Sequence, residues 1–349
     1  MSTPFNTPED SLLLSRLSQI SHVLLVLSGK GGVGKSSVSV QLALSLLASD
    51  PKLRIGLLDV DLTGPSLPKM LGIQDREVLS SRDGWVPVYL DTRTGSTITE
   101  GEGQEEGQAE GGGKLKCMSI GFLLNNSKES VVWRGPKKNA MIKQFLGKVS
   151  WGELDYLIVD TPPGTSDEHI SLLETLRPLL MEPTPDSPPL PTLSSLLVST
   201  PQALALLDVS KELSFVRRTK LPLLGLIENM SGYVCPHCGD IVGIFGQGGG
   251  ESFCQLENSK QGDEYEGGCR FLGRVPIDRE LVALLDDVAE NGGAGFEGEG
   301  KEKRERKTLV ERYREIPSFK VVKSLAEEVK RLIEEQTEEE VKEGRRQST

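Results

Sequence analysis

The residues of this chain best suited to chemistry form a glycine-rich loop near its beginning. Residues 24–37 read LLVLSGKGGVGKSS and contain the pattern G-x-x-x-x-G-K-[ST]. Backbone N–H groups of such a loop point at phosphates, the lysine reaches the β and γ phosphates, and the serine hydroxyl can ligate Mg²⁺. We therefore predict a site for ATP and Mg²⁺. We assign it to Gly29, Lys30, Gly31, Gly32, Val33, Gly34, Lys35, Ser36 and Ser37.

Two acidic motifs follow, each at the end of an apolar segment. Residues 54–61 read RIGLLDVD, and a later segment, LDYLIVD, ends at Asp160 and is followed by TPPGTSD. Strand alternation would place Asp59 and Asp61 on one side, at the carboxyl edge of a sheet where ligands bind in open α/β folds. We predict that Asp160 holds Mg²⁺ through water and that Asp59 supports the metal. Gly164 can approach the γ phosphate.

A pair of cysteines far downstream points to a different chemistry. Cys235 and Cys238, in the sequence CPHC, have metal-ligand spacing, although this spacing also occurs in redox sites and in half of many zinc ribbons. A zinc ribbon needs a second close pair, and a long acidic stretch separates Cys254 from Cys269. A four-cysteine zinc site within one chain is therefore disfavoured. Two chains related by a twofold axis would supply four thiolates, the number that a 4Fe-4S cluster takes.

The elements that must position these residues alternate between strands and helices. Apolar strands are expected at 23–27, 54–61, 154–160, 193–199, 223–228 and 271–276, with helices beginning near 37, 201 and 281. Such alternation implies a mostly parallel sheet covered on both faces. We predict a three-layer α/β P-loop NTPase, with CPHC in a loop that follows Asn229.

The motifs are spread over one sheet, so the length of the chain beyond the core is assigned to insertions and flanking segments. These segments share a composition rich in Gly, Glu or Pro, and lengthening a surface loop costs little free energy. We expect an N-terminal extension at 1–20, a core at 21–289 with disordered insertions near 91–114, 182–192 and 255–268, a low-complexity linker at 290–307, and a C-terminal helix with an acidic tail at 308–349.

The loop GKGGVGKS resembles the deviant Walker A loop of the MinD, ParA, ArsA and nitrogenase iron-protein group. This resemblance implies a nucleotide-dependent dimer in which Lys30 reaches the nucleotide of the partner. It also implies that Asp61 orients the attacking water and that Asn229 contacts adenine, with a plain turn residue as the alternative for Asn229. Lys30, Lys35 and Asp61 are thus the predicted catalytic residues.

Three longer segments are similar to the Mrp/ApbC class of iron-sulfur cluster carriers. They are WRGPKKNAMIKQFL at 133–146, DTPPGTSDEHI at 160–170 and ENMSGYVCPHCG at 228–239. The resemblance implies an ATP-dependent scaffold that assembles a labile 4Fe-4S cluster at a dimer interface through Cys235 and Cys238. The cluster would pass to cytosolic and nuclear apoproteins.

The chain has no cysteine before Cys117, and it therefore resembles the shorter subunit of the eukaryotic cytosolic scaffold. The implied partner is a longer subunit with N-terminal ferredoxin-like cysteines, in a 2+2 heterotetramer, and a homodimer is the alternative. Downstream iron-sulfur targeting factors and apoproteins are further implied partners. Relatives often carry a third cysteine after the pair, and this chain has Gly239 and Asp240 there, so no third ligand is assigned.

Composition argues against several other functional classes of protein. A formal net charge of −11 argues against nonspecific binding of nucleic acid, and no run of about 20 apolar residues predicts a membrane span. The segment 319–343 is dense in glutamate, unlike the basic amphipathic helix of a MinD-like membrane ATPase. Unpaired cysteines fit a reducing compartment, so we expect a cytoplasmic protein, with the nucleus left open. The alternative function is a MinD- or ParA-like switch whose C-x-x-C pair binds zinc.

Overall fold

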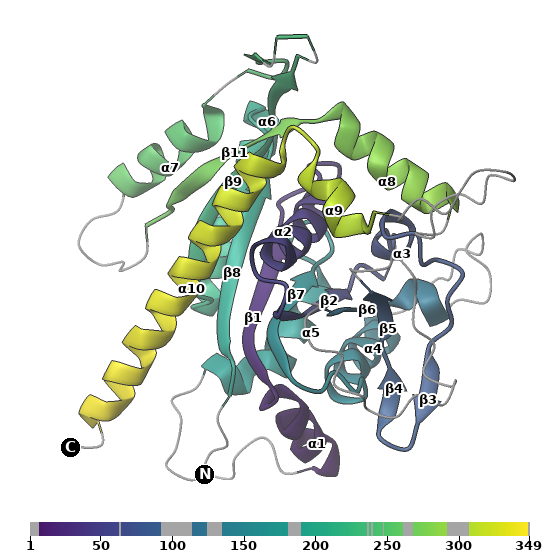
Figure 1. Cartoon of the computed structure of the whole chain (residues 1–349). Coiled ribbons are helices and arrows are strands. Elements are labelled where there is room, and N and C mark those ends of the chain that lie inside the picture. Colours follow the sequence, from purple (N-terminus) through teal and green to yellow (C-terminus); the bar gives the residue numbers. More distant parts are fainter. Residues whose placement is uncertain are drawn as a thin grey trace, which may run out of the picture.

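The computed structural model describes residues 7–62, 64–91, 114–123, 135–180, 190–235, 237–238, 240–246, 248–260, 268–291 and 307–347. The described residues form a central nine-stranded sheet with helices on both faces, and a separate two-stranded ribbon (Figure 1). The predicted three-layer α/β architecture is confirmed. None of the helices within these ranges combines the length and the apolar character needed to cross a bilayer.

The sheet is parallel apart from one strand at each end. Its order is β10-β9-β8-β1-β7-β2-β6-β5, with β11 paired to β9, and only the β5–β6 and β9–β10 pairs are antiparallel. The strands are β1 (Ile20–Leu27), β2 (Arg54–Asp59), β5 (Val88–Asp91), β6 (Lys114–Ser119), β7 (Leu154–Asp160), β8 (Thr192–Ser199), β9 (Leu223–Val234), β10 (Ile241–Val242) and β11 (Phe271–Ile277), and the ribbon pairs β3 (Leu79–Ser81) with β4 (Gly84–Val86).

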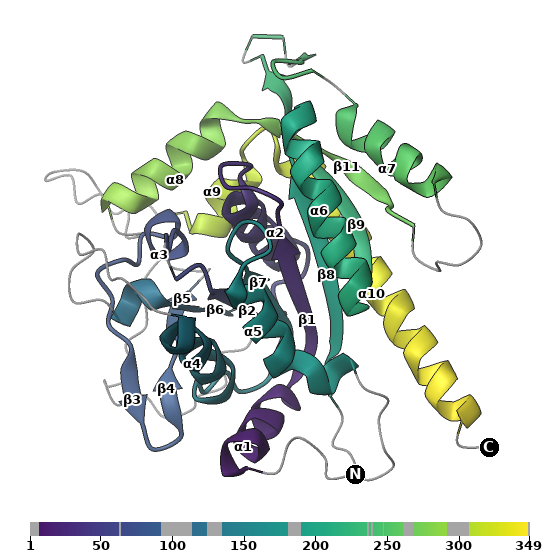
Figure 2. The ribbon, with the colours of Figure 1, turned by 180° about the vertical axis from the view of Figure 1, so that it is seen from behind.

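Helices cover the two faces of this sheet in separate groups. One face carries α2 (Lys35–Ser49), α3 (Leu67–Met70), α8 (Arg279–Asn291), α9 (Leu309–Arg314) and α10 (Phe319–Gln347). The other carries α1 (Pro8–Leu17), α4 (Gly135–Gly147), α5 (Asp167–Leu176), α6 (Ala203–Thr219) and α7 (Gly249–Ser259). Figure 2 shows α4, α5 and α6 in front of the strands, on the face opposite α10. Short 3₁₀ helices span Ile120–Leu123 and Arg177–Leu180.

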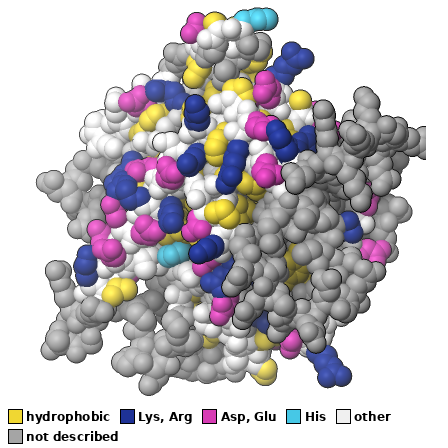
Figure 3. All heavy atoms as spheres, viewed as in Figure 1, with side chains coloured by type: hydrophobic (Ala, Val, Ile, Leu, Met, Phe, Trp, Pro, Cys, Tyr) yellow, Lys and Arg dark blue, Asp and Glu magenta, His cyan; other side chains and the backbone are white. Residues whose placement is uncertain are grey.

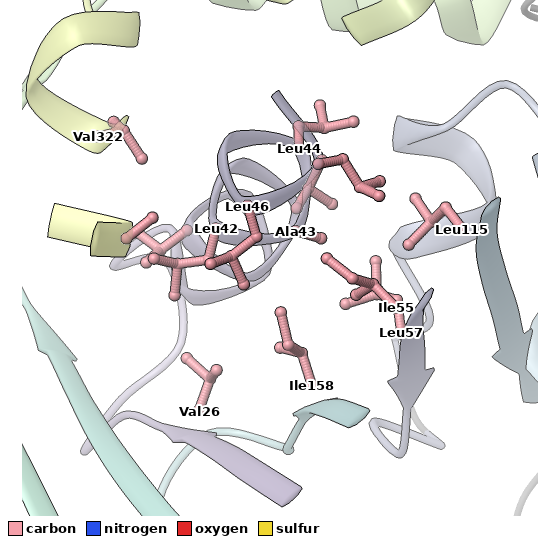
Figure 4. Close-up of a cluster of buried hydrophobic side chains, with 14 of the residues drawn as sticks. Val26, Leu42, Ala43, Leu44, Leu46, Ile55, Leu57, Leu115, Ile158 and Val322 are labelled. Atoms are coloured by element: carbon pink, nitrogen blue, oxygen red, sulfur yellow. The ribbon is translucent and has the colours of Figure 1, made fainter. Parts of the chain in front are cut away.

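The alternation of side chains along β1 explains why one strand serves two cores. Leu24 and Val26 pack into the cluster under α2, whereas Val23 and Leu25 pack into the cluster under α5 and α6. Figure 4 shows side chains of α2 facing strand residues such as Ile158. A strand that is buried on both faces is fixed in register, so the loop after β1 has a rigid base.

The C-terminal helix α10 packs its apolar stripe onto the molecule. Five apolar residues of this stripe are buried: Val322, Leu325, Val329, Leu332 and Ile333. Its outer side carries ion pairs within the helix, such as Arg331 with Glu328 at 2.6 Å. Lys and Arg side chains are interspersed with Asp and Glu over this face of the molecule (Figure 3).

Two expectations about element boundaries were wrong. The strand 223–228 continues to Val234, because β10 and β11 both pair with it and supply hydrogen bonds beyond Asn229. The predicted insertion 255–268 begins inside α7, because Glu257 pairs with Arg217 on α6 at 3.1 Å and buried Cys254 anchors the helix. The rest of this insertion lies mainly outside the described residues, at 261–267. The same holds for the other two predicted insertions and the linker, at 92–113, 181–189 and 292–306.

Candidate nucleotide site and cysteine hairpin

The glycine-rich loop connects β1 directly to α2, as its sequence predicts. Gly32 and Gly34 have φ angles of +78° and +80°, a left-handed conformation that glycine adopts without strain. Gly34 is the N-cap of α2, so the loop ends where the positive end of the helix dipole begins. The predicted Gly31 and Gly32 are exposed, and Val33 is buried.

The loop is packed against two other elements, which limits its movement. A Cβ atom on Gly29 would lie 2.3 Å from the backbone carbonyl carbon of Asp208 on α6. A Cβ atom on Gly34 would lie 2.2 Å from the side-chain nitrogen of Asn229 on β9. Glycine is therefore required at 29 by close approach to a helix backbone, and at 34 the left-handed backbone adds to a close side-chain contact.

Asp160 at the end of β7 gathers the polar groups at the start of α2. Its carboxylate is fully buried and lies 2.6 Å from the Lys35 ammonium. The Ser36 hydroxyl donates to the other carboxylate oxygen at 2.5 Å, and the Ser39 hydroxyl donates at 2.9 Å. Lys35, Ser36 and Asp160 thus converge on one point, and Ser37 lies half-buried in the same first turn.

Asp59 lies beside Asp160 in the sheet, and its carboxylate organises the loop after β2. It accepts hydrogen bonds from the backbone N–H of Asp61 at 3.1 Å and of Ser66 at 3.2 Å, and from the Ser119 hydroxyl at 3.2 Å. Burial, together with the neighbouring Asp160 carboxylate, raises the pKa of Asp59 to about 8. The contacts of Asp59 in this structure are those of a loop anchor, and its predicted support of Mg²⁺ stays a prediction.

The two remaining catalytic candidates lie on loops at the same edge of the sheet. Asp61 is half-buried just beyond β2, which ends at Asp59, and its carboxylate accepts a hydrogen bond from the Gly64 N–H at 3.2 Å. Lys30 is half-buried in the glycine-rich loop, where its carbonyl accepts from the Ser28 hydroxyl at 3.2 Å. Their predicted roles in hydrolysis stay predictions.

The segment after Asp160 folds back onto the glycine-rich loop. The Gly164 N–H donates to the Ser28 carbonyl at 2.7 Å, and Gly164 has a φ of +72°. The Thr161 hydroxyl donates to the Val26 carbonyl at 2.8 Å. We call residues 161–166 the switch segment. Its contacts place Gly164 against the loop, as a group that senses a γ phosphate would require.

Asn229 lies on β9 and touches the loop from the opposite side. Its side-chain amide donates to the Val33 carbonyl at 2.9 Å, and the residue is buried. The contact observed here therefore supports the loop, while the predicted contact with adenine stays a prediction. The sequence gives no sign of this contact, because residues 33 and 229 are far apart in the chain.

The CPHC pair, predicted in a loop after Asn229, lies at the tip of a β-hairpin. Strand β9 ends at Val234, β10 returns antiparallel, and the Cys235 N–H donates to the Asp240 carbonyl at 2.9 Å. Cys235 is half-buried and Cys238 is exposed. Hydrogen bonds from the backbone of Cys238 and of His237 lower the pKa of the Cys235 thiol. The tip thus presents two thiols with the spacing of a soft-metal site.

The other two downstream cysteines meet each other and lie apart from this tip. Cys254 on α7 and Cys269 just before β11 are both buried, with their sulfur atoms 3.0 Å apart. Among the residues that the structure describes, no group of three or more Cys, His, Asp and Glu side chains is arranged to hold a metal. The assignment of Cys235 and Cys238 as the metal ligands stays a prediction.

Comparison with known proteins decides the family. Residues 19–316 match the ParA family of NUBPL iron-transfer P-loop NTPases. The chain belongs to this family. It is 52% identical over 288 residues to a protein of Mycosarcoma maydis named cytosolic Fe-S cluster assembly factor CFD1, covering 81% of this chain and 68% of that protein. It is 49% identical to the Gallus gallus cytosolic Fe-S cluster assembly factor NUBP2, covering 78% of this chain and 85% of that protein.

One solved structure is similar to this chain over most of its length. It is a nucleotide-binding protein from Archaeoglobus fulgidus in complex with ADP, 31% identical, with a TM-score of 0.57 over 84% of this chain and 98% of that chain. These matches confirm the predicted P-loop NTPase fold and enzyme class and the resemblance to the iron-sulfur cluster carriers. The MinD- or ParA-like alternative with zinc is not favoured.

Proposed function

We propose that this chain is an ATP-dependent scaffold that assembles a labile 4Fe-4S cluster between two chains and transfers it to cytosolic and nuclear apoproteins. The observation that carries the proposal is that β9 serves both sites. Asn229 of this strand bonds the glycine-rich loop, and Cys235 follows its last residue. Relatives named as cytosolic Fe-S cluster assembly factors support this function and a cytosolic location.

The cluster is the cargo of the reaction, and its ligands would be shared between chains. Cys235 and Cys238 supply two thiolates, whereas a 4Fe-4S cluster takes four. A twofold axis near the two hairpin tips would bring the second pair from a partner. A cluster held at an exposed seam by few ligands is accessible to an acceptor protein, which suits transfer.

The residues at the nucleotide site fit ATP with Mg²⁺. Ser36 and Asp160 present hard oxygen ligands, which Mg²⁺ prefers, and Lys35 at the same point supplies positive charge for phosphates. Bound Mg²⁺ would neutralise charge that develops on the phosphates. In our proposal Lys35 holds the β and γ phosphates, Asp61 orients the attacking water, and Lys30 reaches the partner's nucleotide.

The distance between the two sites is short enough for mechanical coupling. Cys235 lies six positions after Asn229, so along β9 the two are at most about 20 Å apart. A change in the conformation of the glycine-rich loop or of the switch segment on hydrolysis would be transmitted to β9 through Asn229. We propose that this movement alters the geometry of the dimer and so loads or releases the cluster.

The partner that we propose is the longer scaffold subunit with N-terminal ferredoxin-like cysteines, in a 2+2 heterotetramer. A homodimer would satisfy the same thiol count and is the alternative. Downstream targeting factors and apoproteins would receive the cluster.

The test is anaerobic reconstitution of the full chain, alone and with the longer subunit, followed by measurement of iron and sulfide per dimer. The wild type is expected to bind a cluster that is lost in Cys235→Ala with Cys238→Ala. The matched control is Cys254→Ala with Cys269→Ala, which removes two thiols that face each other in the core and is expected to keep the iron. Zinc or no metal in the wild type, or loss of iron in the control, would overturn the assignment.

A further inference from the structure

A buried histidine joins both ends of the switch segment. His169 lies on the first turn of α5 and is only 1% exposed. Its Nε2 atom lies 3.1 Å from the Thr161 hydroxyl, and its Nδ1 atom lies 3.4 Å from the Ser166 backbone nitrogen. One ring therefore contacts the first and the last residue of the segment that carries Gly164.

The hydrogen bonds of the ring fix where its proton lies. A backbone N–H can only donate, so Nδ1, facing the Ser166 N–H, must be the acceptor. Burial lowers the pKa of His169 to about 4, so the ring is neutral and its single proton is on Nε2. The Thr161 hydroxyl already donates to the Val26 carbonyl, and its oxygen therefore accepts from Nε2–H.

A buried carboxyl group faces the same proton from the other side. Glu212 on α6 is 1% exposed, and neither of its carboxyl oxygens has a hydrogen-bond partner among the residues that the structure describes. One of these oxygens lies 3.9 Å from His169 Nε2, just beyond hydrogen-bonding distance. A buried polar group without a hydrogen-bond partner costs free energy, so its presence in the core needs an explanation.

Helix α6 also forms the wall of the glycine-rich loop. Gly29 packs on the backbone of Asp208 and Val209, one helical turn before Glu212. Figure 2 shows α5 and α6 on the same face of the sheet. The position of the switch segment relative to α6 is therefore set by His169 on one side and by Gly29 on the other.

We propose that His169 is a positioning residue that holds the switch segment against the glycine-rich loop, and that Glu212 is the second acceptor for its Nε2–H when Thr161 moves away. The inference deepens the proposed function, on which it rests, by assigning the control of the ATPase site to a hydrogen bond with two alternative acceptors. Thr161 is the acceptor in this structure. In the open arrangement Glu212 gains the partner that it lacks here.

The first experiment is hydrogen exchange of the full chain without nucleotide, in the wild type and in His169→Phe. Phenylalanine keeps a ring in the core but removes both hydrogen bonds. Exchange at the amides of the switch segment is expected to rise about tenfold, the change that follows from the loss of one or two neutral hydrogen bonds. His169→Gln, which can still donate to Thr161, is expected to restore part of the protection.

A purely structural histidine would give a different pattern. It would raise exchange throughout the core in both variants, and glutamine would not rescue the segment. Unchanged exchange in the segment, or a uniform rise across the chain, would overturn the proposal. Iron bound by His169→Phe is expected to equal that of the wild type, because the hairpin thiols are untouched.

The second experiment separates binding of ATP from its hydrolysis. His169→Phe is expected to lower kcat for ATP about tenfold and to change KM less than threefold, because Lys35 and the loop remain. Glu212→Leu removes the second acceptor, and its effect on exchange and on kcat is expected to vanish in the His169→Phe background. If the effects of Glu212→Leu and His169→Phe add, the proposal that Thr161 and Glu212 are alternative acceptors for the Nε2 proton is refuted. If the wild type binds no cluster or hydrolyses no ATP, the proposed function fails, and exchange still decides the role of His169.

Discussion

The buried carboxyl group of Glu212 makes the stability of the protein depend on pH in a direction that can be worked out. Burial raises its pKa from 4.5 to about 7. The folded state therefore binds the proton more tightly than the unfolded state. Stability from the protonated group is fully present below pH 4.5 and is lost as pH rises through about 7.

The magnitude follows from the same pKa values. Each pKa unit is worth about 1.4 kcal/mol, so a rise from 4.5 to about 7 corresponds to a loss of about 3 kcal/mol between those pH values. Glu212→Gln has no titrating group at this position. Relative to the wild type, the variant is expected to gain about 3 kcal/mol of unfolding free energy between pH 4.5 and pH 8. The nearby His169 titrates in both proteins, so its contribution largely cancels in the difference between their unfolding free energies.

The assay is equilibrium unfolding in urea at pH 5, 6, 7 and 8, followed by far-ultraviolet circular dichroism. Glu174→Gln is the matched control, since it removes an exposed carboxyl group from α5, and its difference from the wild type is expected to be constant with pH. A difference between Glu212→Gln and the wild type that is constant from pH 5 to pH 8, or that falls as pH rises, would refute the reasoning.

Two further predictions concern the nucleotide site. Lys35→Ala is expected to abolish nucleotide binding. It is also expected to lower the free energy of unfolding by about 3 kcal/mol or more, because it leaves the Asp160 carboxylate buried without its ion pair. ATP affinity is measured by calorimetry with the exposed Lys52→Ala as the control, and an unchanged affinity in Lys35→Ala would refute the loop assignment. Asn229→Ala leaves the Val33 carbonyl without its donor, at a cost of about 1–3 kcal/mol. Equal losses of ATP and GTP affinity would indicate loop support, whereas a loss confined to ATP would indicate contact with adenine.

Local sequence patterns predicted much of the fold and the types of residue at the site. The segment LDYLIVD became β7 at the expected boundaries, because an apolar strand buried on both faces carries an unambiguous signal. Strand β2 begins at Arg54 as expected but ends at Asp59, two residues before the predicted end at Asp61, where the Asp59 carboxylate accepts a hydrogen bond from the Asp61 N–H. The glycine-rich loop lies between β1 and α2 for a similar reason, since its glycines and its lysine act within a few residues of each other.

Elements whose stability comes from distant partners were harder to predict. Strand β9 runs through Met230 and Gly232, both with positive φ angles, and is held by β10 and β11. The last turns of α7 are held by Arg217 on another helix. Neither extension has a local pattern strong enough to indicate it, because the stabilising contacts come from residues elsewhere in the chain.

The phosphate-binding loop, the acidic strand ends and the cysteine pair with metal-ligand spacing can all be recognised in the sequence. The contacts between distant groups appear only in the folded chain: Lys35 with Asp160, Asn229 with Val33, and His169 between Thr161 and Glu212. The physical reason is that spacing along a chain fixes contacts within one element. A buried polar group instead takes its partner from whatever element the packing of the core brings beside it.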